Sequence, residues 1–529
     1  MITSKYDLIV IGGGINGAGI ARDASQRGLS VLLLEKNDFG SGTSSWSSRL
    51  IHGGLRYLEY GEISLVYESL HDRRALLKVA PHLVKPLRIS IPIFKDSERG
   101  RLLVRLGMIA YDLLSLGKEL PGHKMLNKKD ALVEMPGINE QGLKGLAQYY
   151  DAQVEYAERL VMENVLAAQE DGATTLNYCE VIDIDVEDAC AQGVRWQNTR
   201  TGLIERATAP MIVNAAGPWV DRVLERANQS GMLRYMGGTK GSHIVLPVFD
   251  GAPESALYVE AASDGRPIFI IPWNRQLLVG TTDIRIDQSP EDVVATDEEC
   301  EYLLAEVNRV FPTANLDLNA IHHRYAGVRP LPRKTEGPES AISRKHLLKH
   351  HNHIARGLYS VIGGKLTTYL SLANDMLKRL DRDFSLGLPK TATDELALPG
   401  ARPYESTSAP EWLGELTLSH LLSVYGGRCE QVVALAEQDS GLREIVDEYS
   451  GAIAAEVVFA VRAEAAYTLD DVINRRTMLG LGPDRGLSAA AKVATVMANE
   501  LEWTGEFKAA QVSAFEKTAL TRFSASRID

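Results

Sequence analysis

Cysteine is scarce in this chain. The 529 residues include four cysteines, with no C-x-x-C pair among them. A disulfide scaffold, a cysteine-rich zinc site or a conventional iron–sulfur cluster requires paired or clustered cysteines. The lack of such pairs excludes these three classes and favours a reducing compartment.

Long hydrophobic runs are also missing. No stretch approaches the roughly 20 apolar residues that a membrane-spanning helix needs. The first predicted strand begins at Leu8, which leaves no room ahead of it for a signal or transit peptide. We therefore expect a cytoplasmic protein that contacts a membrane only peripherally.

The chain has no excess of positive charge. Its net charge of −12 at pH 7 argues against general nucleic-acid binding. Hydrophobic residues make up 45% and charged residues 24%, a balance that excludes disorder, collagen and coiled coil. The length corresponds to about two or three domains.

The first 35 residues carry a dinucleotide-binding pattern. The apolar run 8–11 predicts a buried strand of a parallel sheet, followed by a helix and by a second strand that ends in Glu35. Between strand and helix stand Gly12, Gly14 and Gly17 in G-x-G-x-x-G spacing. They permit a tight turn, the approach of a pyrophosphate and close helix–strand packing. Glu35 can then accept hydrogen bonds from a ribose.

The segment after Glu35 favours a flavin over a nicotinamide dinucleotide. A simple nicotinamide dehydrogenase would continue into another helix, whereas residues 36–57 form a long loop rich in glycine and small hydroxyl residues. Such a loop can meet the phosphates and the ring edge of a deeply placed flavin with hydroxyl and amide groups. The expected contacts are Thr43, Ser44, Ser45, His52, Gly53 and Gly54.

Three later motifs extend the expected cofactor site. Residues 213–219 and 277–283 each form a strand that ends in a tight turn, and residues 360–369 form a strand, a glycine turn and a helix. The last offers backbone amides and a lysine to the electron-rich N1–O2 edge of a reduced flavin. The expected contacts are Ala216, Gly217, Asp283, Gly364, Lys365, Leu366 and Thr367.

The motifs together resemble the FAD-dependent sn-glycerol-3-phosphate dehydrogenases of the D-amino-acid-oxidase-like superfamily. The resemblance rests on IGGGINGAGIARDA, SSRLIHGGLRYLE, NAAGPWV, KGSHIVLP, GTTD, YAGVRPL and GGKLTTY, in this order. The stretch from Ala465 resembles that family's C-terminal domain. The resemblance implies an α/β protein: a Rossmann-like FAD-binding domain of the glutathione-reductase/DAO type, an antiparallel-sheet substrate domain and an all-α C-terminal domain. It also implies non-covalent FAD.

The implied reaction is oxidation of sn-glycerol 3-phosphate to dihydroxyacetone phosphate by hydride transfer to flavin N5, with electrons passed to a membrane quinone. Arg329 and Arg344 match the family's pair of phosphate-binding arginines. Guanidinium groups suit this role because they bind a phosphate dianion bidentately and stay charged. Arg56 and Tyr57 match positions beside the substrate, and His243 matches a histidine near the reacting hydroxyl.

Three residues compete for the proton chemistry at the substrate C2 hydroxyl. We assign His243 as the base, since histidine has a pKa near the working pH. The alternative for His243 is a core histidine that orients Lys240 or the flavin. His52 is a rival base, although its loop favours a flavin contact. Arg329 is the second candidate catalytic residue, because it can stabilise the developing alkoxide.

Residues 71–130 form a basic segment, with thirteen basic and six acidic side chains. Within it, residues 101–114 are strongly apolar, and their arginines suit an anionic headgroup region. The alternative is a core helix whose arginines reach solvent. Because the implied quinone lies in the membrane, we expect residues 95–118 to contact an anionic lipid surface, at the cytoplasmic face of the inner membrane.

Motif order and composition predict three domains. The C-terminal one is helical and carries no motif with assignable chemistry, so we expect it to serve packing, partner docking or formation of a homodimer. We interpret the histidine-rich segment 346–353 as a solvated basic hairpin, and we expect no metal there. The predicted ranges are 1–85, 145–235 and 340–397 for the FAD-binding domain, 86–144 and 236–339 for the substrate domain, and 400–529 for the helical domain.

Three rival functions stay open at this point. A glycerol-3-phosphate oxidase would use the same site but reduce O₂ to H₂O₂, and the sequence shows no residue that decides the acceptor. A D-amino-acid-type oxidase would direct the paired arginines to a carboxylate. A non-enzymatic flavoprotein would make His243, Arg329 and Arg344 expendable.

Overall fold

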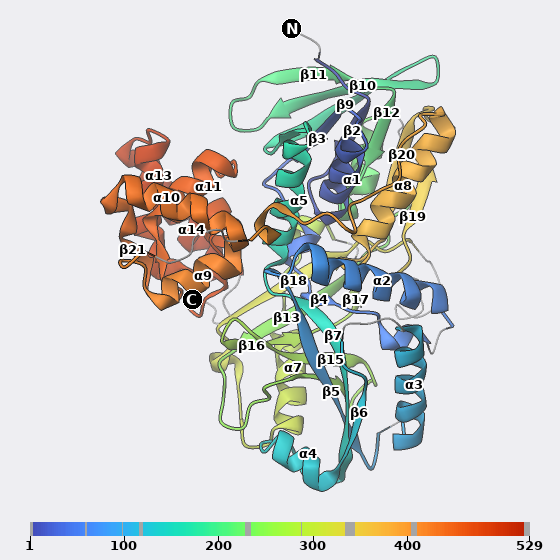
Figure 1. Cartoon of the computed structure of the whole chain (residues 1–529), viewed down its shortest axis with the longest axis vertical. Coiled ribbons are helices and arrows are strands. Elements are labelled where there is room, and N and C mark those ends of the chain that lie inside the picture. Colours follow the sequence, from blue (N-terminus) through green and yellow to red (C-terminus); the bar gives the residue numbers. More distant parts are fainter. Residues whose placement is uncertain are drawn as a thin grey trace.

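The computed structural model describes residues 4–58, 61–97, 99–115, 120–227, 234–286, 288–333, 344–403 and 410–522 (Figure 1). Its chain order alternates strands and helices at the start and becomes helical at the end. Strand β2 (Leu8–Ile11) and strand β3 (Val31–Leu34) are fully buried, as their apolar sequences predict. Helix α1 (Ile15–Gln26) begins directly after the glycine turn.

A six-stranded sheet forms the first layer and is parallel except for β19 at one edge. Its order is β19-β20-β12-β2-β3-β8. The other strands are β8 (Thr174–Leu176), β12 (Met211–Asn214), β19 (Leu347–His350) and β20 (Leu358–Ile362). Because side chains alternate along a strand, Leu8 and Val10 of β2 pack in one core cluster and Ile9 and Ile11 in another.

Helices and a small sheet cover the two faces of this layer. Helix α1 packs between α5 (Ala157–Glu170) and α8 (Tyr369–Phe384) on one side. On the other side lies a four-stranded sheet of order β1-β11-β10-β9. Its strands are β1 (Ser4–Lys5), β9 (Cys179–Glu187), β10 (Cys190–Asn198) and β11 (Ile204–Thr208), and α6 (Val220–Glu225) lies after β12.

A ten-stranded, mainly antiparallel sheet forms the second layer (Figure 1). Its core path is β17-β13-β16-β15-β14-β5-β7-β4, and β18 and β6 pair with β13 and β7. The strands are β4 (Leu50–Ile51), β5 (Val84–Phe94), β6 (Lys124–Asn127), β7 (Leu143–Val154), β13 (Thr239–Leu246), β14 (Ala256–Glu260), β15 (Pro267–Trp273), β16 (Gln276–Gly280), β17 (Ile284–Arg285) and β18 (His323–Arg329).

The second sheet takes in residues that the sequence places in the FAD-binding domain. Strand β7 pairs with β5 up to Val154, although the predicted FAD range resumes at residue 145. Strand β4 also pairs with β7. The pairing is long-range, so the apolar pattern of β7 alone carries no sign of which sheet it joins. Helices α4 (Lys128–Glu134) and α7 (Asp297–Val310) pack on this sheet, with α2 (Ile63–Val79) and α3 (Arg101–Leu114) nearby.

The C-terminal part is a cluster of helices beside α5, shown in orange and red in Figure 1. The helices are α9 (Glu415–Tyr425), α10 (Cys429–Gln438), α11 (Ala454–Ala463), α12 (Leu469–Asp471), the π-helix η10 (Val472–Arg476), α13 (Leu487–Glu500) and α14 (Gly505–Arg522). A two-stranded ladder of β21 (Ile445–Asp447) and β22 (Ala452–Ile453) interrupts them. Within the described ranges, no helix has both the length and the apolar character that crossing a membrane requires.

Candidate active site and cofactor site

A cavity of about 1950 Å³ lies between the two large sheets and receives residues from the C-terminal helices. We divide its wall into two regions. The Glu35 region comprises Glu35 and the glycine turn, of which Gly12 and Gly14 line the cavity and Gly13 and Gly17 lie behind it. The Arg329 region comprises His243, Thr281, Asp283, Arg329 and Arg344.

The glycine turn leaves no space for side chains. Gly12 has a φ of +108°, and a Cβ on it would lie 2.8 Å from the Ala215 carbonyl oxygen. A Cβ on Gly17 would lie 1.8 Å from the Gly12 carbonyl oxygen, so helix and turn touch here through backbone atoms. Gly14 faces the Ser44 hydroxyl, 3.3 Å from where its Cβ would be. This is the shape that a pyrophosphate-binding turn requires.

Glu35 is fixed beside that turn. Its carboxylate accepts hydrogen bonds from the amide groups of Gly13 at 2.7 Å and Asn37 at 2.9 Å. Burial raises the pKa of Glu35, and the two amides oppose that rise. Glu35 lines the cavity, as an acceptor for ribose hydroxyls must.

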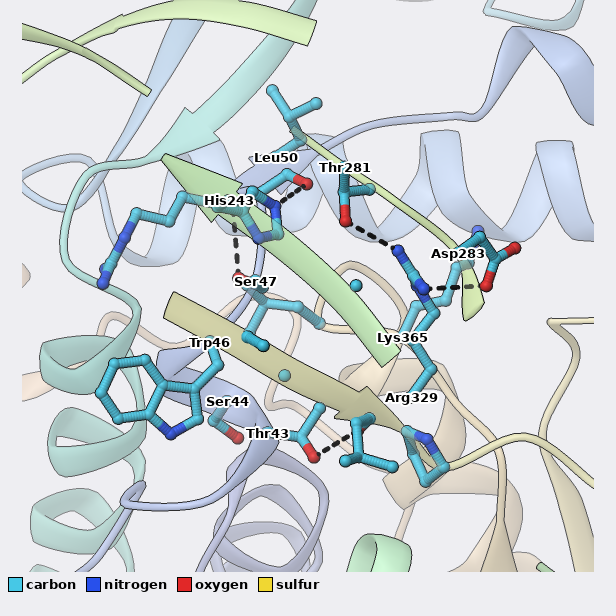
Figure 2. A pocket seen from close by; sticks show the side chains of 18 of the residues that line it. Thr43, Ser44, Trp46, Ser47, Leu50, His243, Thr281, Asp283, Arg329 and Lys365 are labelled. Atoms are coloured by element: carbon cyan, nitrogen blue, oxygen red, sulfur yellow. Dashed lines mark hydrogen bonds and ion pairs between the residues drawn. The ribbon is translucent and has the colours of Figure 1, made fainter. Parts of the chain in front are cut away.

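The three hydroxyl residues that follow take different directions. Ser44 accepts a hydrogen bond from the Ile15 amide at 3.0 Å, at the start of α1. Thr43 donates to the Val328 carbonyl at 2.7 Å and so joins this loop to β18 (Figure 2). Both line the cavity. The Ser45 hydroxyl instead donates to the Gly40 carbonyl at 2.7 Å, so it stabilises the loop from within.

The His52–Gly54 turn is held by buried polar groups. The Gly53 amide donates to Asp151 at 3.2 Å, and a Cβ on Gly53 would meet the Tyr111 hydroxyl. His52 and Gly54 line the cavity, while Gly53 lies behind them. Burial, with the nearby Lys365 charge, lowers the pKa of His52 to about 4, so the ring is neutral at pH 7.

The turn after β20 lies against the same part of the wall. Gly364 has a φ of +91°, and Lys365 donates to the Ser69 hydroxyl at 2.7 Å. Burial lowers the pKa of Lys365 to about 8. The Thr367 hydroxyl accepts from the His52 amide at 3.3 Å, which connects two of the predicted cofactor segments. Ala216, Gly217, Gly364, Lys365, Leu366 and Thr367 all line the cavity.

Arg329 is the centre of the second region. Its guanidinium donates to Asp283 at 2.9 Å, to the Thr281 hydroxyl at 3.0 Å and to the Thr282 carbonyl at 3.0 Å (Figure 2). Arg344 lies 3.5 Å from the other Asp283 oxygen. Burial lowers the pKa of Arg329, and the Asp283 carboxylate opposes that change. Asp283, predicted at the cofactor, thus joins the two arginines predicted to bind phosphate.

His243 lies next to this cluster on β13 and is 2% exposed. Its Nε2 is 2.9 Å from the Ser48 hydroxyl, and its ring stacks on Tyr325 with centroids 4.8 Å apart. Burial, together with the Arg329 and Arg49 charges, lowers the pKa of His243 to about 3. The imidazole is therefore neutral at pH 7 and can accept a proton, but this pKa lies well below the working pH that the sequence argument assumed for the base.

Two further predicted residues lie in the 3₁₀ turn Leu55–Leu58. Tyr57 lines the cavity, and the Lys365 ammonium is 4.7 Å from its ring centroid. The side chain of Arg56 lies outside the described part of the structure. Within the described ranges, no group of three or more metal-binding side chains is placed to hold an ion.

The sequence analysis missed the groups that hold these loops in place. Arg49 makes a buried, bidentate ion pair with Glu158, at 2.7 Å for both oxygens. The Tyr325 hydroxyl donates to the Ser47 carbonyl at 2.8 Å, and Asp151 accepts from Tyr111 at 2.8 Å. Arg49 and Tyr325 stand inside motifs that the sequence singles out. Their partners are distant in sequence, so spacing alone gave no sign of their roles.

The features of this cavity fit FAD. The glycine turn has the shape that binds a pyrophosphate, Glu35 can accept hydrogen bonds from a ribose, and Thr43 and Ser44 line the wall in the loop that follows. The family model of the FAD dependent oxidoreductases (DAO) matches residues 7–370, and the model named C-terminal domain of alpha-glycerophosphate oxidase matches residues 391–508. Both matches agree with the two-sheet part and the helical part of the fold.

Two relatives and one solved structure are similar to this chain over most of its length. The chain is 44% identical to the glycerol-3-phosphate dehydrogenase of a Synechocystis species, over 95% of this chain and 94% of the relative. It is 39% identical to the D-erythritol 1-phosphate dehydrogenase of Brucella abortus, over 89% and 94%. The FAD-complexed glycerol-3-phosphate dehydrogenase of Bacillus halodurans superposes with a TM-score of 0.79 at 28% identity, covering 99% of this chain and 96% of that one. This chain belongs to the FAD-dependent glycerol-3-phosphate dehydrogenases of the DAO family, and its cofactor is FAD.

Proposed function

We propose that this protein oxidises sn-glycerol 3-phosphate to dihydroxyacetone phosphate and passes the electrons to a membrane quinone. The observation that carries the substrate assignment is the Arg329 region. Two guanidinium groups converge on Asp283 beside a buried, neutral histidine, inside a cavity whose other wall fits FAD. An anion-binding group and a proton acceptor are what a phosphorylated alcohol requires.

The chain's residues divide the reaction between them. Arg329 and Arg344 bind the phosphate, and Asp283 holds both guanidinium groups in position before the substrate arrives. His243 takes the proton of the C2 hydroxyl at Nε2, the ring nitrogen that bonds the Ser48 hydroxyl at 2.9 Å, because Nδ1 is buried. Tyr325 fixes the plane of that ring. Bound FAD supplies the acceptor for the two electrons that leave the substrate.

Helix α3 supports a membrane acceptor. Leu102, Leu103 and Leu106 are 72%, 59% and 55% exposed, and the neighbouring Arg101 and Arg105 are exposed as well. Apolar side chains with interspersed arginines suit a helix that lies in an anionic headgroup region. Leu103 also lines the cavity, so the same helix lies on the way from a lipid surface to the site. We therefore propose that α3 contacts lipid and that the quinone approaches here.

The lipid contact is tested by sedimentation with anionic vesicles. Leu102→Glu combined with Leu106→Glu is expected to release the protein, and Arg101→Glu with Arg105→Glu to weaken sedimentation in a salt-dependent way. Arg99 is not used, because it forms an ion pair with Glu260. Leu203→Glu, at an exposed position before β11, is the matched control. Unchanged sedimentation of both double variants would contradict the proposal.

The reaction is tested by anaerobic mixing of the yellow protein with sn-glycerol 3-phosphate, following flavin absorbance at about 450 nm. We expect rapid bleaching, and recovery that is faster with a quinone analogue than with air. Equal recovery in air would indicate an oxidase. D-Erythritol 1-phosphate is the comparison substrate, and faster bleaching by it than by sn-glycerol 3-phosphate would contradict the substrate assignment.

A further inference from the structure

The loop that follows Glu35 is held by residues more than four hundred positions away. Asp38 is 1% exposed. Its Oδ2 accepts from Arg475 at 2.6 Å, and its two oxygens accept a bidentate pair from Arg476 at 2.8 Å each. Both arginines lie on the π-helix η10 of the C-terminal part. Asp38 is three residues from Glu35, the expected ribose acceptor.

Further contacts join the same loop to the same helices. Asn177 donates both to Asp38 at 2.9 Å and to the Ala465 carbonyl at 3.0 Å. The Tyr178 hydroxyl donates to Asp471 at 2.6 Å, while its amide donates to the Asn37 carbonyl at 2.8 Å. Residues 37–38 and 177–178 are therefore tied to each other and to η10 and α12.

The Asp38 carboxylate and the guanidinium groups of Arg475 and Arg476 are buried together, so each would be a buried, unpaired charge without the other. Burial by itself would raise the pKa of Asp38, but Arg476 and Arg475 outweigh it and lower the pKa to about 2. Removing one partner of a buried ion pair leaves an uncompensated charge, which is far more costly than the pair is stabilising. If the C-terminal helices separate, Asp38 must therefore take up water and its loop must rearrange.

The C-terminal helices also form part of the cavity wall. Thr468, Leu469, Asp470 and Arg475 line the same cavity as Glu35, Asn37 and Asp38. We propose that Arg475 and Arg476 are positioning residues for FAD: they hold residues 35–38 in the binding conformation, so docking of the C-terminal domain and binding of FAD stabilise each other. By linkage, each must favour the other by the same factor. This gives the C-terminal domain a role in the cofactor site.

The test is FAD binding to flavin-free full-length protein, measured by quenching of flavin fluorescence. Asp38→Asn and Arg476→Lys are expected to raise the FAD dissociation constant about tenfold or more, the typical effect of losing a charge-assisted hydrogen bond. Arg402→Gln is the matched control, because Arg402 also forms an ion pair with the part of the chain before residue 400, with Glu170 at the end of α5, but this pair is exposed. It is expected to bind FAD as the wild type does. Wild-type affinity in Asp38→Asn and Arg476→Lys would overturn the proposal.

A second measurement needs no variant and decides the matter where a variant does not fold. Amide hydrogen exchange is followed in the wild-type protein with and without FAD. We expect FAD to slow exchange in residues 468–476 and to leave α13 unchanged. Equal exchange of residues 468–476 in both states would show that the C-terminal domain does not sense FAD, and the coupling would be rejected.

Discussion

The Glu35 region and the Arg329 region share one cavity but are built on different principles. The first is shaped by backbone: the turn and helix α1 touch at Gly12 and Gly17, where there is no space for a side chain. The second is shaped by side chains, with the Arg329 guanidinium held by Asp283 and Thr281. Changes in the first region should therefore affect FAD binding as a whole. Changes in the second region should alter substrate affinity or kcat and leave FAD bound.

The largest expected effect breaks the backbone region. In Gly17→Ala the new Cβ would lie 1.8 Å from the Gly12 carbonyl oxygen, so the turn must open. We expect the purified variant to contain almost no flavin, measured as the ratio of flavin to protein absorbance. Gly414→Ala is the control, because a Cβ there meets nothing within 4 Å. If Gly17→Ala carried a full complement of flavin, FAD binding would not depend on the close backbone contact between Gly12 and Gly17.

The next effect separates catalysis from binding. His243→Gln should lower kcat by roughly 10²- to 10⁴-fold, the usual contribution of general-base catalysis, with normal flavin content. His323→Gln, another buried histidine, should leave kcat unchanged.

The pH profile carries the same assignment. Since burial lowers the pKa of His243 to about 3, the ring keeps its base form at every pH above that value. The wild-type kcat/KM should then show no loss assignable to His243 as the pH falls from 8 to 5. A drop near the ordinary histidine pKa that disappears in His243→Gln would contradict the buried, neutral ring.

A smaller effect sharpens the side-chain region. Inorganic phosphate should inhibit competitively, raising the apparent KM for sn-glycerol 3-phosphate without changing kcat. In Arg329→Lys the planar guanidinium and its contacts with Asp283 and Thr281 are lost, and we expect the inhibition constant to rise about tenfold. Arg324→Lys is the control on the same strand, since Arg324 pairs with Asp297 instead. Non-competitive inhibition, or an unchanged constant in Arg329→Lys, would place the phosphate elsewhere.

The smallest effect lies outside both regions and concerns stability. Burial lowers the pKa of His323 to about 3, so the folded protein stays neutral there while the unfolded chain takes up a proton below pH 6.5. Proton uptake by the unfolded chain lowers the free energy of unfolding. The contribution of neutral His323 to that free energy is fully present above pH 6.5 and is lost as the pH falls from 6.5 toward 3. At pH 5.5 the loss is about 1.4 kcal/mol. Denaturant titrations at pH 8 and 5.5 should show a smaller difference for His323→Gln than for the wild type.

Local sequence predicts the parts of this site that local interactions build. The buried strands β2 and β3, the glycine turn and Glu35 follow from an apolar run and a glycine spacing, and the structure places them as expected. The family motifs further identified the arginine pair, and the structure brings Arg329 and Arg344 to one carboxylate.

Long-range contacts decide the rest. Ser45 turns inward to Gly40, and Asp283, which lines the cavity, also pairs with Arg329. Strand β7 joins the second sheet through pairing with β5. Asp38 meets Arg476 across 438 positions. Contacts of this kind cannot be predicted from hydrophobic periodicity or motif spacing, because they depend on how distant segments pack.

The division of the cavity is tested most directly by one anaerobic titration of Arg329→Lys with sn-glycerol 3-phosphate. We predict that the variant carries a full complement of FAD and that half-bleaching of the flavin needs at least about tenfold more substrate than in the wild type. Half-bleaching at the wild-type concentration, or loss of FAD from the variant, would contradict the account.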